Sequence, residues 1–313
     1  MVQVYLLLFA GLALLFVSGR FLVDSSVAIS RRLHIPRMVI GLTVVAFGTS
    51  APELLVSLQA AFSGYPEIAI GNVVGSNISN ILLVLALTAL IFPIPAPATS
   101  VKLDWPIMMG VSLLLFFFSL NGMISRQEGA ILVILLAAYV LFSVLRSKGL
   151  NRDGQKEADG NQMKWWTAVI LFLVSCAGLA KGADMLVDNV ALIADEIGIS
   201  KRVVSITMVA VGTSIPEVAT SVIAALKKET EISVGNIIGS NIMNILSVLG
   251  VTSLVNPISV SPAIARFDIP WMLGVTLLML LLMLPASRSR ITRWEGLLMI
   301  LIYLLYIYFL FKT

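Results

Sequence analysis

The sequence predicts an all-α polytopic membrane protein in which ten transmembrane helices form two inverted five-helix repeats. Three observations predict this fold: a shortage of charge, ten long apolar runs, and a repeat that spans the chain. Of the 313 residues, 58% are apolar and 12% are charged, whereas soluble domains carry about 25% charged residues. The mean hydropathy is +1.00. This composition excludes a water-soluble enzyme, a disordered chain and a nucleic-acid-binding protein.

The apolar runs have the length of membrane-spanning helices. A helix needs about 20 mainly apolar residues to cross a bilayer, and strands of an outer-membrane barrel would alternate polar and apolar residues instead. The first run lacks a basic leader and a clear cleavage site, so we expect it to be a retained span. The predicted spans are 3–22, 37–61, 67–92, 105–121, 128–146, 165–183, 202–226, 231–255, 269–285 and 295–311.

Basic residues fall unevenly on the two sides of this ten-span arrangement. Loops after odd-numbered spans hold 15 of the 21 Lys and Arg residues, and the opposite side holds 6. Because cytoplasmic loops carry the excess of basic residues, the odd-numbered loops are predicted to be cytoplasmic. We therefore expect a multi-pass protein of the cell (cytoplasmic) membrane with both termini on the extracytoplasmic side.

Two motifs recur at an offset of 164 residues. The block Gly48–Glu53 (GTSAPE) returns as Gly212–Glu217 (GTSIPE), and Gly71–Asn80 (GNVVGSNISN) returns as Gly235–Asn244 (GNIIGSNIMN). An odd number of spans in each half places the second copy upside down in the membrane. The sequence therefore predicts a first five-helix repeat over residues 1–146, a polar cytoplasmic linker over 147–164, and a second, inverted repeat over 165–313.

The two motif glutamates are the candidates for function. Glu53 and Glu217 occupy matching positions within the second and seventh spans, where an ionisable group costs a few kcal/mol. No basic residue lies in the middle of these spans. Two carboxylates without basic partners predict a cation site. The alternative is a pair of protonated glutamates that hydrogen-bond to neighbouring helices.

Proline residues next to the glutamates predict that the second and seventh helices are discontinuous. Pro52 and Pro216 lack an N–H group, so the carbonyl groups of Gly48 and Gly212 lose their helical donors. Freed carbonyl groups within a membrane must face water or an ion. The same block supplies hydroxyl oxygens beside the carboxylates, from Thr49, Ser50, Thr213 and Ser214.

The third and eighth spans carry a second polar stripe. Side chains at i, i+4 and i+8 share one face of a helix. On this face we predict oxygen atoms that line a cation site, from the side chains of Ser76, Asn80, Ser240 and Asn244. The alternative is that these side chains form hydrogen bonds between helices. For Asn72 and Asn236 both interpretations stay open. The motif glycines are predicted to allow close helix packing, and Asp104 and Asp268 are predicted to be helix N-caps.

The ligand types indicate a hard cation. The motifs offer carboxylate, hydroxyl, amide and carbonyl oxygens but no Cys or His, which argues against zinc and copper. Ca²⁺ takes six to eight oxygen ligands in a flexible shell, whereas Mg²⁺ demands a tight octahedron. Two carboxylates neutralise one Ca²⁺ or are shared among several Na⁺.

The paired GTSxPE and GNxxGSNxxN motifs closely resemble the two α-repeats of the sodium/calcium exchanger family, within the Ca²⁺/cation antiporter superfamily, in its short prokaryotic form. The resemblance implies a non-enzymatic Ca²⁺/Na⁺ antiporter without a cofactor, embedded in the lipid bilayer, in which two long helices slide over a core. It also implies that the carboxylates of Glu53 and Glu217 and the carbonyl groups of Thr49, Thr213, Ala46 and Ala210 are metal ligands. Ser50, Ser214, Ser76, Ser240, Asn80 and Asn244 would line the site. No protein partner or nucleic acid is implied.

Other functions stay open from sequence. The nearest alternative is a Ca²⁺/H⁺ antiporter, because glutamates also accept protons. Potassium-dependent relatives carry Asp at the position of Asn244, which argues against a requirement for K⁺. A cation channel is a further alternative, whereas an intramembrane hydrolase lacks a plausible nucleophile and base.

The charge asymmetry makes a direct prediction about orientation. A reporter that is active only in the cytoplasm is expected to be inactive when it is fused after Thr313. The same reporter inserted into the 147–164 linker should be active and serves as the control. Activity of the C-terminal fusion would contradict the ten-span arrangement.

Overall fold

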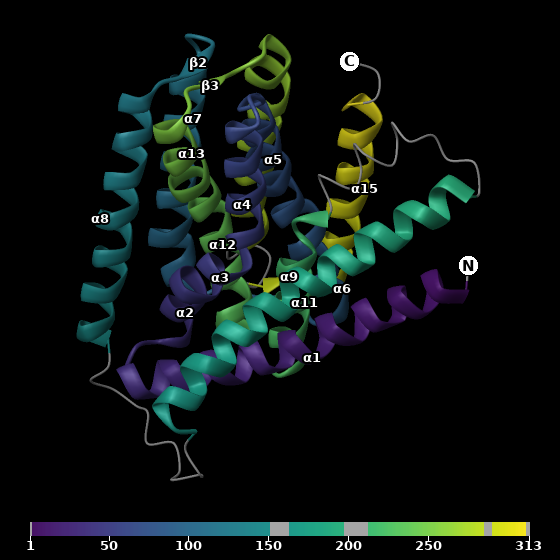
Figure 1. The fold of residues 1–313 in the computed structure, drawn as a ribbon. Coiled ribbons are helices and arrows are strands. Elements are labelled where there is room, and N and C mark those ends of the chain that lie inside the picture. Colours follow the sequence, from purple (N-terminus) through teal and green to yellow (C-terminus); the bar gives the residue numbers. More distant parts are fainter. Residues whose placement is uncertain (1, 151–162, 197–211, 285–289, 311–313) are drawn as a thin grey trace.

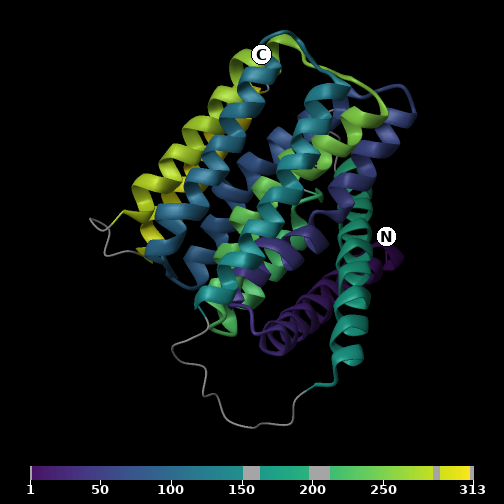
Figure 2. The ribbon, with the colours of Figure 1, turned by 90° about the vertical axis from the view of Figure 1, so that its left-hand side faces the viewer.

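The computed structural model describes residues 2–150, 163–196, 212–284 and 290–310, and these residues form an almost entirely helical protein (Figures 1 and 2). Within these ranges, eight helices are long and apolar enough to cross a membrane, or nine if a bent helix pair counts as one span. Most of the first half of the predicted seventh span, 202–226, lies outside the described residues. The count of ten spans therefore stays a prediction.

The elements of the first part of the chain are α1 (Val2–Leu33), α2 (Arg37–Ile40), η1 (Gly41–Val45), α3 (Ala46–Thr49), α4 (Ala51–Phe62), α5 (Glu67–Ser79), η2 (Asn80–Leu85), α6 (Ala86–Ile91), β1 (Ile94–Pro95), η3 (Ser100–Asp104), α7 (Trp105–Ser119), β2 (Met123–Ile124) and α8 (Arg126–Leu150). Those of the second part are α9 (Trp165–Glu196), α11 (Ile215–Leu226), α12 (Thr230–Met243), η4 (Asn244–Leu249), α13 (Gly250–Val255), β3 (Ile258–Ser259), η5 (Ile264–Asp268), α14 (Ile269–Met283), β4 (Arg290–Ile291) and α15 (Arg293–Leu310). The η elements are π-helical turns.

The two longest helices, α1 and α9, pack against each other on the outside of the bundle and run in opposite directions (Figures 1 and 2). They exceed the predicted spans 3–22 and 165–183 by 11 and 13 residues at their C-terminal ends. The hydropathy of the sequence shows where the apolar stretch ends, but each helix continues beyond that point. In α1 the helix continues because Ser25 and Ser26 are fully buried against the rest of the protein.

The second span is broken where the sequence predicts a break. Helix Arg37–Thr49 and helix Ala51–Phe62 meet at an angle of 42°. Ser50, between them, leaves the helical conformation with φ −85° and ψ 6°, and Pro52 stands in the first turn of α4. Ser214 repeats this conformation before α11, with φ −85° and ψ 0°. Because residues 197–211 are not described, the discontinuity of the seventh span stays a prediction.

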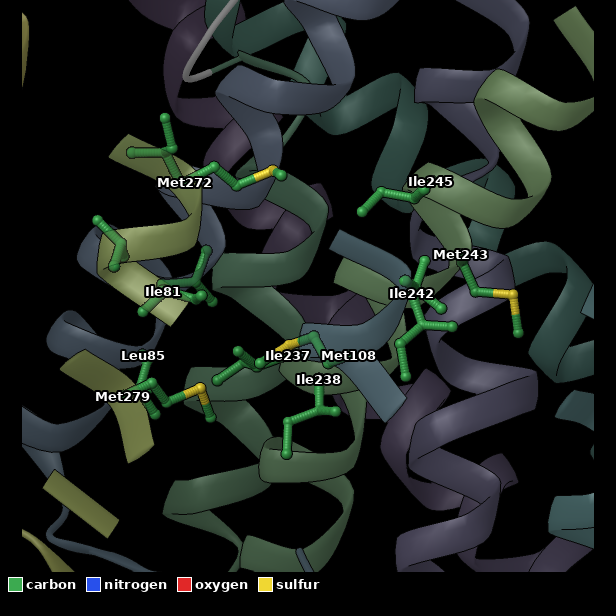
Figure 3. Packing of buried hydrophobic residues seen from close by; sticks show 14 of the residues in the cluster. Ile81, Leu85, Met108, Ile237, Ile238, Ile242, Met243, Ile245, Met272 and Met279 are labelled. Atoms are coloured by element: carbon green, nitrogen blue, oxygen red, sulfur yellow. The ribbon is translucent and has the colours of Figure 1, made fainter. Parts of the chain in front are cut away.

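The spans that carry the second motif form the centre of the bundle. Helices α5–η2–α6 and α12–η4–α13 contain the most buried span windows. The apolar core surrounds them: Figure 3 shows Leu85 of η2 beside Met279 of α14, and Ile237 of α12 beside Met108 of α7. The π-helical turns η2 and η4 start at Asn80 and Asn244. Such turns are frequent at functional sites.

Two short antiparallel strand pairs join segments that are far apart in sequence. Strand β1 pairs with β4, where Ile94 lies opposite Ile291, and β2 pairs with β3, where Ile124 lies opposite Ile258. Each pair therefore joins the first part of the chain to the second part.

The prediction for the motif glycines is confirmed in the eighth span only. A Cβ added to Gly239 would lie 2.5 Å from the carbonyl oxygen of Leu42, and one added to Gly235 would lie 2.7 Å from that of Met38. The second span thus packs backbone to backbone against α12. Gly71 and Gly75 show no such contact among the described residues.

The prediction that Asp104 and Asp268 are N-caps is wrong. Both residues have helical dihedral angles and make no capping bond, because the π-helical turns η3 and η5 extend each helix by about a turn toward its N-terminus. Asp104 is instead buried beside Arg146, with 3.1 Å between Oδ1 and Nη1. Asp268 Oδ1 accepts a hydrogen bond of 2.8 Å from the hydroxyl of Tyr306.

The close packing at Gly239 predicts a loss of stability on substitution. Gly239→Ala places a methyl group against the Leu42 backbone, which cannot rotate away, and overpacking of this kind costs about 1–3 kcal/mol. We expect a lower unfolding temperature in detergent. Gly110→Ala is the control, since a Cβ there meets nothing within 4 Å. Equal stability of the two variants would contradict the packing.

Candidate cation site

Glu53 and Glu217 meet in the interior of the protein. They stand in the first turns of α4 and α11, both side chains are 0% exposed, and they are close enough to interact electrostatically. Glu217 Oε1 lies 3.3 Å from the Ser50 hydroxyl and 3.5 Å from the Ser240 hydroxyl, which both donate to it. Among the described residues, Glu217 Oε2 and both oxygens of Glu53 have no hydrogen-bond partner. Three carboxylate oxygens are thus available inside the protein.

Thr49 connects the first broken helix to α12. Its hydroxyl donates to Asn236 Oδ1 at 3.0 Å and lies 3.4 Å from the Ser240 hydroxyl. The same hydroxyl is 3.3 Å from the carbonyl oxygen of Ala46, which also accepts a bond of 2.9 Å from the Ser50 N–H group. Ala210, the counterpart of Ala46, lies outside the described residues.

Thr213, the counterpart of Thr49, connects the chain just before α11 to α5. Its hydroxyl lies 3.3 Å from Asn72 Oδ1 and 3.2 Å from the Ser76 hydroxyl, both on α5. Each motif threonine therefore contacts the Asn and Ser residues of the opposite copy of the second motif.

Asn72 and Asn236 form hydrogen bonds between helices, which is one of the two roles that the sequence leaves open for them. Asn72 Nδ2 donates to the Ser57 hydroxyl at 3.2 Å, and Asn236 Nδ2 donates to the Ser221 hydroxyl at 3.0 Å. The sequence analysis missed Ser57 and Ser221. Their signal is present, since they lie 164 residues apart and each follows a motif glutamate by four positions.

The remaining predicted residues are buried in the same interior. Ser76, Ser240, Asn80, Asn244 and Ser214 are all 0% exposed. Three of these five residues carry side-chain atoms without a partner among the described residues: both amide atoms of Asn80, Asn244 Oδ1 and the Ser214 hydroxyl. Buried polar atoms normally have a partner, so this concentration of unpaired oxygens points to a ligand that is bound through oxygen.

The donor set fits a hard cation. The described hydrogen bonds to the Glu217 carboxylate come from the hydroxyl groups of Ser50 and Ser240, and no basic side chain is among these donors. Within the described ranges no cluster of three or more His, Cys, Asp or Glu residues occurs. Carboxylate, amide and hydroxyl oxygens suit Ca²⁺ and Na⁺.

The fold and this interior define a membrane protein of many spans with a buried, all-oxygen candidate site for a cation. Comparison with known proteins identifies the family to which this membrane protein belongs. The family model described as "Sodium/calcium exchanger protein" matches residues 3–145 and 167–312. CaxA of Alkalimonas amylolytica is 38% identical over 313 residues, with 97% of each chain covered. The sodium/calcium exchanger MaX1 of Methanosarcina acetivorans is 33% identical over 345 residues, with 98% of each chain covered.

A solved structure of the sodium-calcium exchanger NCX_Mj matches this fold with a TM-score of 0.84 and 32% sequence identity, over 99% of this chain and 100% of that chain. The chain belongs to the sodium/calcium exchanger family. It is accordingly a multi-span membrane protein and a cation antiporter.

The hydrogen bond between Thr49 and Asn236 predicts that substitution of Thr49 lowers stability more than substitution of Thr220, another buried threonine. Thr49→Val leaves the Asn236 side chain without its donor, which costs about 1–3 kcal/mol. Thr220→Val is the matched control, because the Thr220 hydroxyl is buried without a partner among the described residues. We expect denaturation in detergent to show a loss of stability for Thr49→Val only. Equal effects would contradict the hydrogen bond.

Proposed function

We propose that the protein exchanges Ca²⁺ for Na⁺ by alternating access at the site between Glu53 and Glu217. The observation that carries this proposal is a pair of fully buried, interacting carboxylates from matching positions, of whose four oxygens three have no hydrogen-bond partner among the described residues. The name of the relative MaX1, a sodium/calcium exchanger, supports the same choice of ions.

The ligands of the transported ions are the residues that the motifs indicate. Glu53 and Glu217 provide the charge, and further oxygens come from the side chains or carbonyl groups of Thr49, Thr213, Ser50, Ser214, Ser76, Ser240, Asn80, Asn244, Ala46 and Ala210. Two carboxylates neutralise one Ca²⁺ or are shared among several Na⁺. Because both ions need the same carboxylates, they exclude each other, and this exclusion is the physical basis of exchange.

The proposed architecture is two inverted repeats of five helices, residues 1–146 and 165–313, joined by the cytoplasmic linker 147–164. The second and seventh helices are discontinuous, and both termini are extracytoplasmic. The reciprocal contacts of Thr49 and Thr213 and the reciprocal strand pairs support this symmetry. Inverted repeats of this kind bind their substrates at the midplane, where the halves meet.

Alternating access requires that only the ion-loaded site permits the conformational change. In the empty site the two carboxylates repel each other in a medium of low dielectric constant. A bound cation removes this repulsion and lets α1 and α9 slide over the remaining helices. Their position on the outside of the bundle, packed mainly against each other, supports this role (Figure 1).

The proposal predicts the behaviour of glutamine variants. In proteoliposomes, an outward Na⁺ gradient should drive ⁴⁵Ca²⁺ uptake, and Glu53→Gln or Glu217→Gln should reduce uptake by at least about a hundredfold, because each removes half of the charge that neutralises Ca²⁺. Glu231→Gln is the control, since Glu231 is exposed at the start of α12. Unchanged uptake in both motif variants would overturn the assignment of the site.

A second arm of the same assay separates exchange with Na⁺ from exchange with H⁺. A proton gradient without Na⁺ should drive no ⁴⁵Ca²⁺ uptake. Uptake that needs only the proton gradient would identify a Ca²⁺/H⁺ antiporter, and flux without any counter-ion gradient would identify a channel.

A further inference from the structure

Asn77, one position after Ser76, is engaged in a chain of hydrogen bonds that ends at Asn244. Its amide nitrogen Nδ2 donates to the backbone carbonyl oxygen of Asn241 at 3.2 Å and lies 3.7 Å from the sulfur of Met272. Its amide oxygen Oδ1 accepts a bond of 3.1 Å from Asn244 Nδ2. Asn77 is 1% exposed, and Asn244 is 0% exposed.

The backbone carbonyl of Asn241 fixes the direction of every bond in this chain. A carbonyl oxygen only accepts, so Asn77 must turn its Nδ2 toward Asn241. Asn77 Oδ1 then points to Asn244, and because an amide oxygen only accepts, Asn244 must donate the bond from its Nδ2. The remaining amide atom of Asn244, its oxygen Oδ1, is buried and has no partner among the described residues. If the Asn244 amide were free to flip, its NH₂ group would sometimes take the position of Oδ1, and an NH₂ group does not bind a cation.

The equivalent residue in the other half is arranged differently. Asn241 corresponds to Asn77 at the offset of 164, but its Nδ2 donates to Ile237 O of its own helix at 2.7 Å. Asn80, the counterpart of Asn244, has no hydrogen-bond partner for either amide atom among the described residues. The Asn244 amide is therefore held in one orientation, whereas the Asn80 amide has no such hydrogen bond among the described residues.

We propose that Asn77 is a positioning residue that fixes the amide of Asn244 so that oxygen, rather than N–H, faces the transported cation. This inference rests on the proposed function of the site. In this proposal Asn77 acts through Asn244: its Nδ2 donates to the carbonyl oxygen of Asn241, and its Oδ1 accepts the bond from Asn244 Nδ2. The asymmetry between Asn244 and Asn80 gives the site one amide oxygen in a fixed place and one that adjusts to the ion.

A double-mutant cycle tests this role. The apparent affinities for Ca²⁺ and Na⁺ are measured on purified protein in detergent, from the rise in unfolding temperature as each ion is titrated. Asn77→Leu has nearly the same shape as asparagine but no hydrogen bonds, and we expect it to weaken the affinity for at least one of the two ions about three- to tenfold. Asn241→Leu, the matched control, should change the affinities by less than about twofold, because the Asn241 amide nitrogen bonds to Ile237 O of its own helix and not to Asn80 or Asn244.

The decisive comparison is made in the Asn244→Leu background, which lacks the amide that Asn77 positions. There Asn77→Leu should cause no further loss of affinity, because its effect passes through Asn244. A loss of the same size in both backgrounds, or an equal loss in Asn241→Leu, would show a general structural role and overturn the proposal. Asn77→Ala repeats the cycle if the leucine variant does not fold.

The cycle distinguishes failure of this inference from failure of the proposed function. If both ions stabilise the wild-type protein but ⁴⁵Ca²⁺ uptake does not respond to Na⁺, exchange is refuted and the role of Asn77 is still decided by the affinities. If neither ion stabilises the wild-type protein, Asn244 has no cation to bind and both proposals are refuted.

Discussion

Glu53 and Glu217 repel each other in the interior of the protein, and the helices around them must accommodate this repulsion. Two carboxylates that interact inside a protein, at 0% exposure, require compensation by a cation or by protons. The described surroundings offer hydroxyl and amide groups instead of basic side chains. The helices around the site are therefore arranged to leave oxygens unpaired, which is the opposite of what stability alone would favour.

The broken helices are the means by which the chain brings these oxygens together. At Ser50 the backbone leaves the helix just before Pro52, so the carboxylate of Glu53 projects from the first turn of a new helix. Ser214, Pro216 and Glu217 repeat the arrangement. The close packing of Gly235 and Gly239 against the second span then brings the threonine of that span within reach of Asn236. Local backbone chemistry and tight helix packing together create the site.

Sequence alone predicted the membrane class, the two glutamates and the break at Ser50, because a buried charge, a proline and a repeated motif carry signals in single residues. It did not predict the C-terminal extensions of α1 and α9, since polar residues such as Ser25 end an apolar run without ending a helix. The error at Asp104 has a similar cause, because no sequence pattern marks the π-helical turn η3 that precedes α7. Asn77 was missed because its importance lies in the direction of a hydrogen bond to a distant backbone carbonyl, which appears only in three dimensions.

If Ca²⁺ and Na⁺ share the carboxylates of Glu53 and Glu217, the two ions must compete in equilibrium binding of ⁴⁵Ca²⁺ to the purified protein. Titration with Na⁺ should displace all bound ⁴⁵Ca²⁺, and raising the Ca²⁺ concentration should shift the Na⁺ midpoint upward without limit. A plateau at which bound ⁴⁵Ca²⁺ persists in saturating Na⁺ would mean that the two ions occupy separate sites, and it would contradict this account.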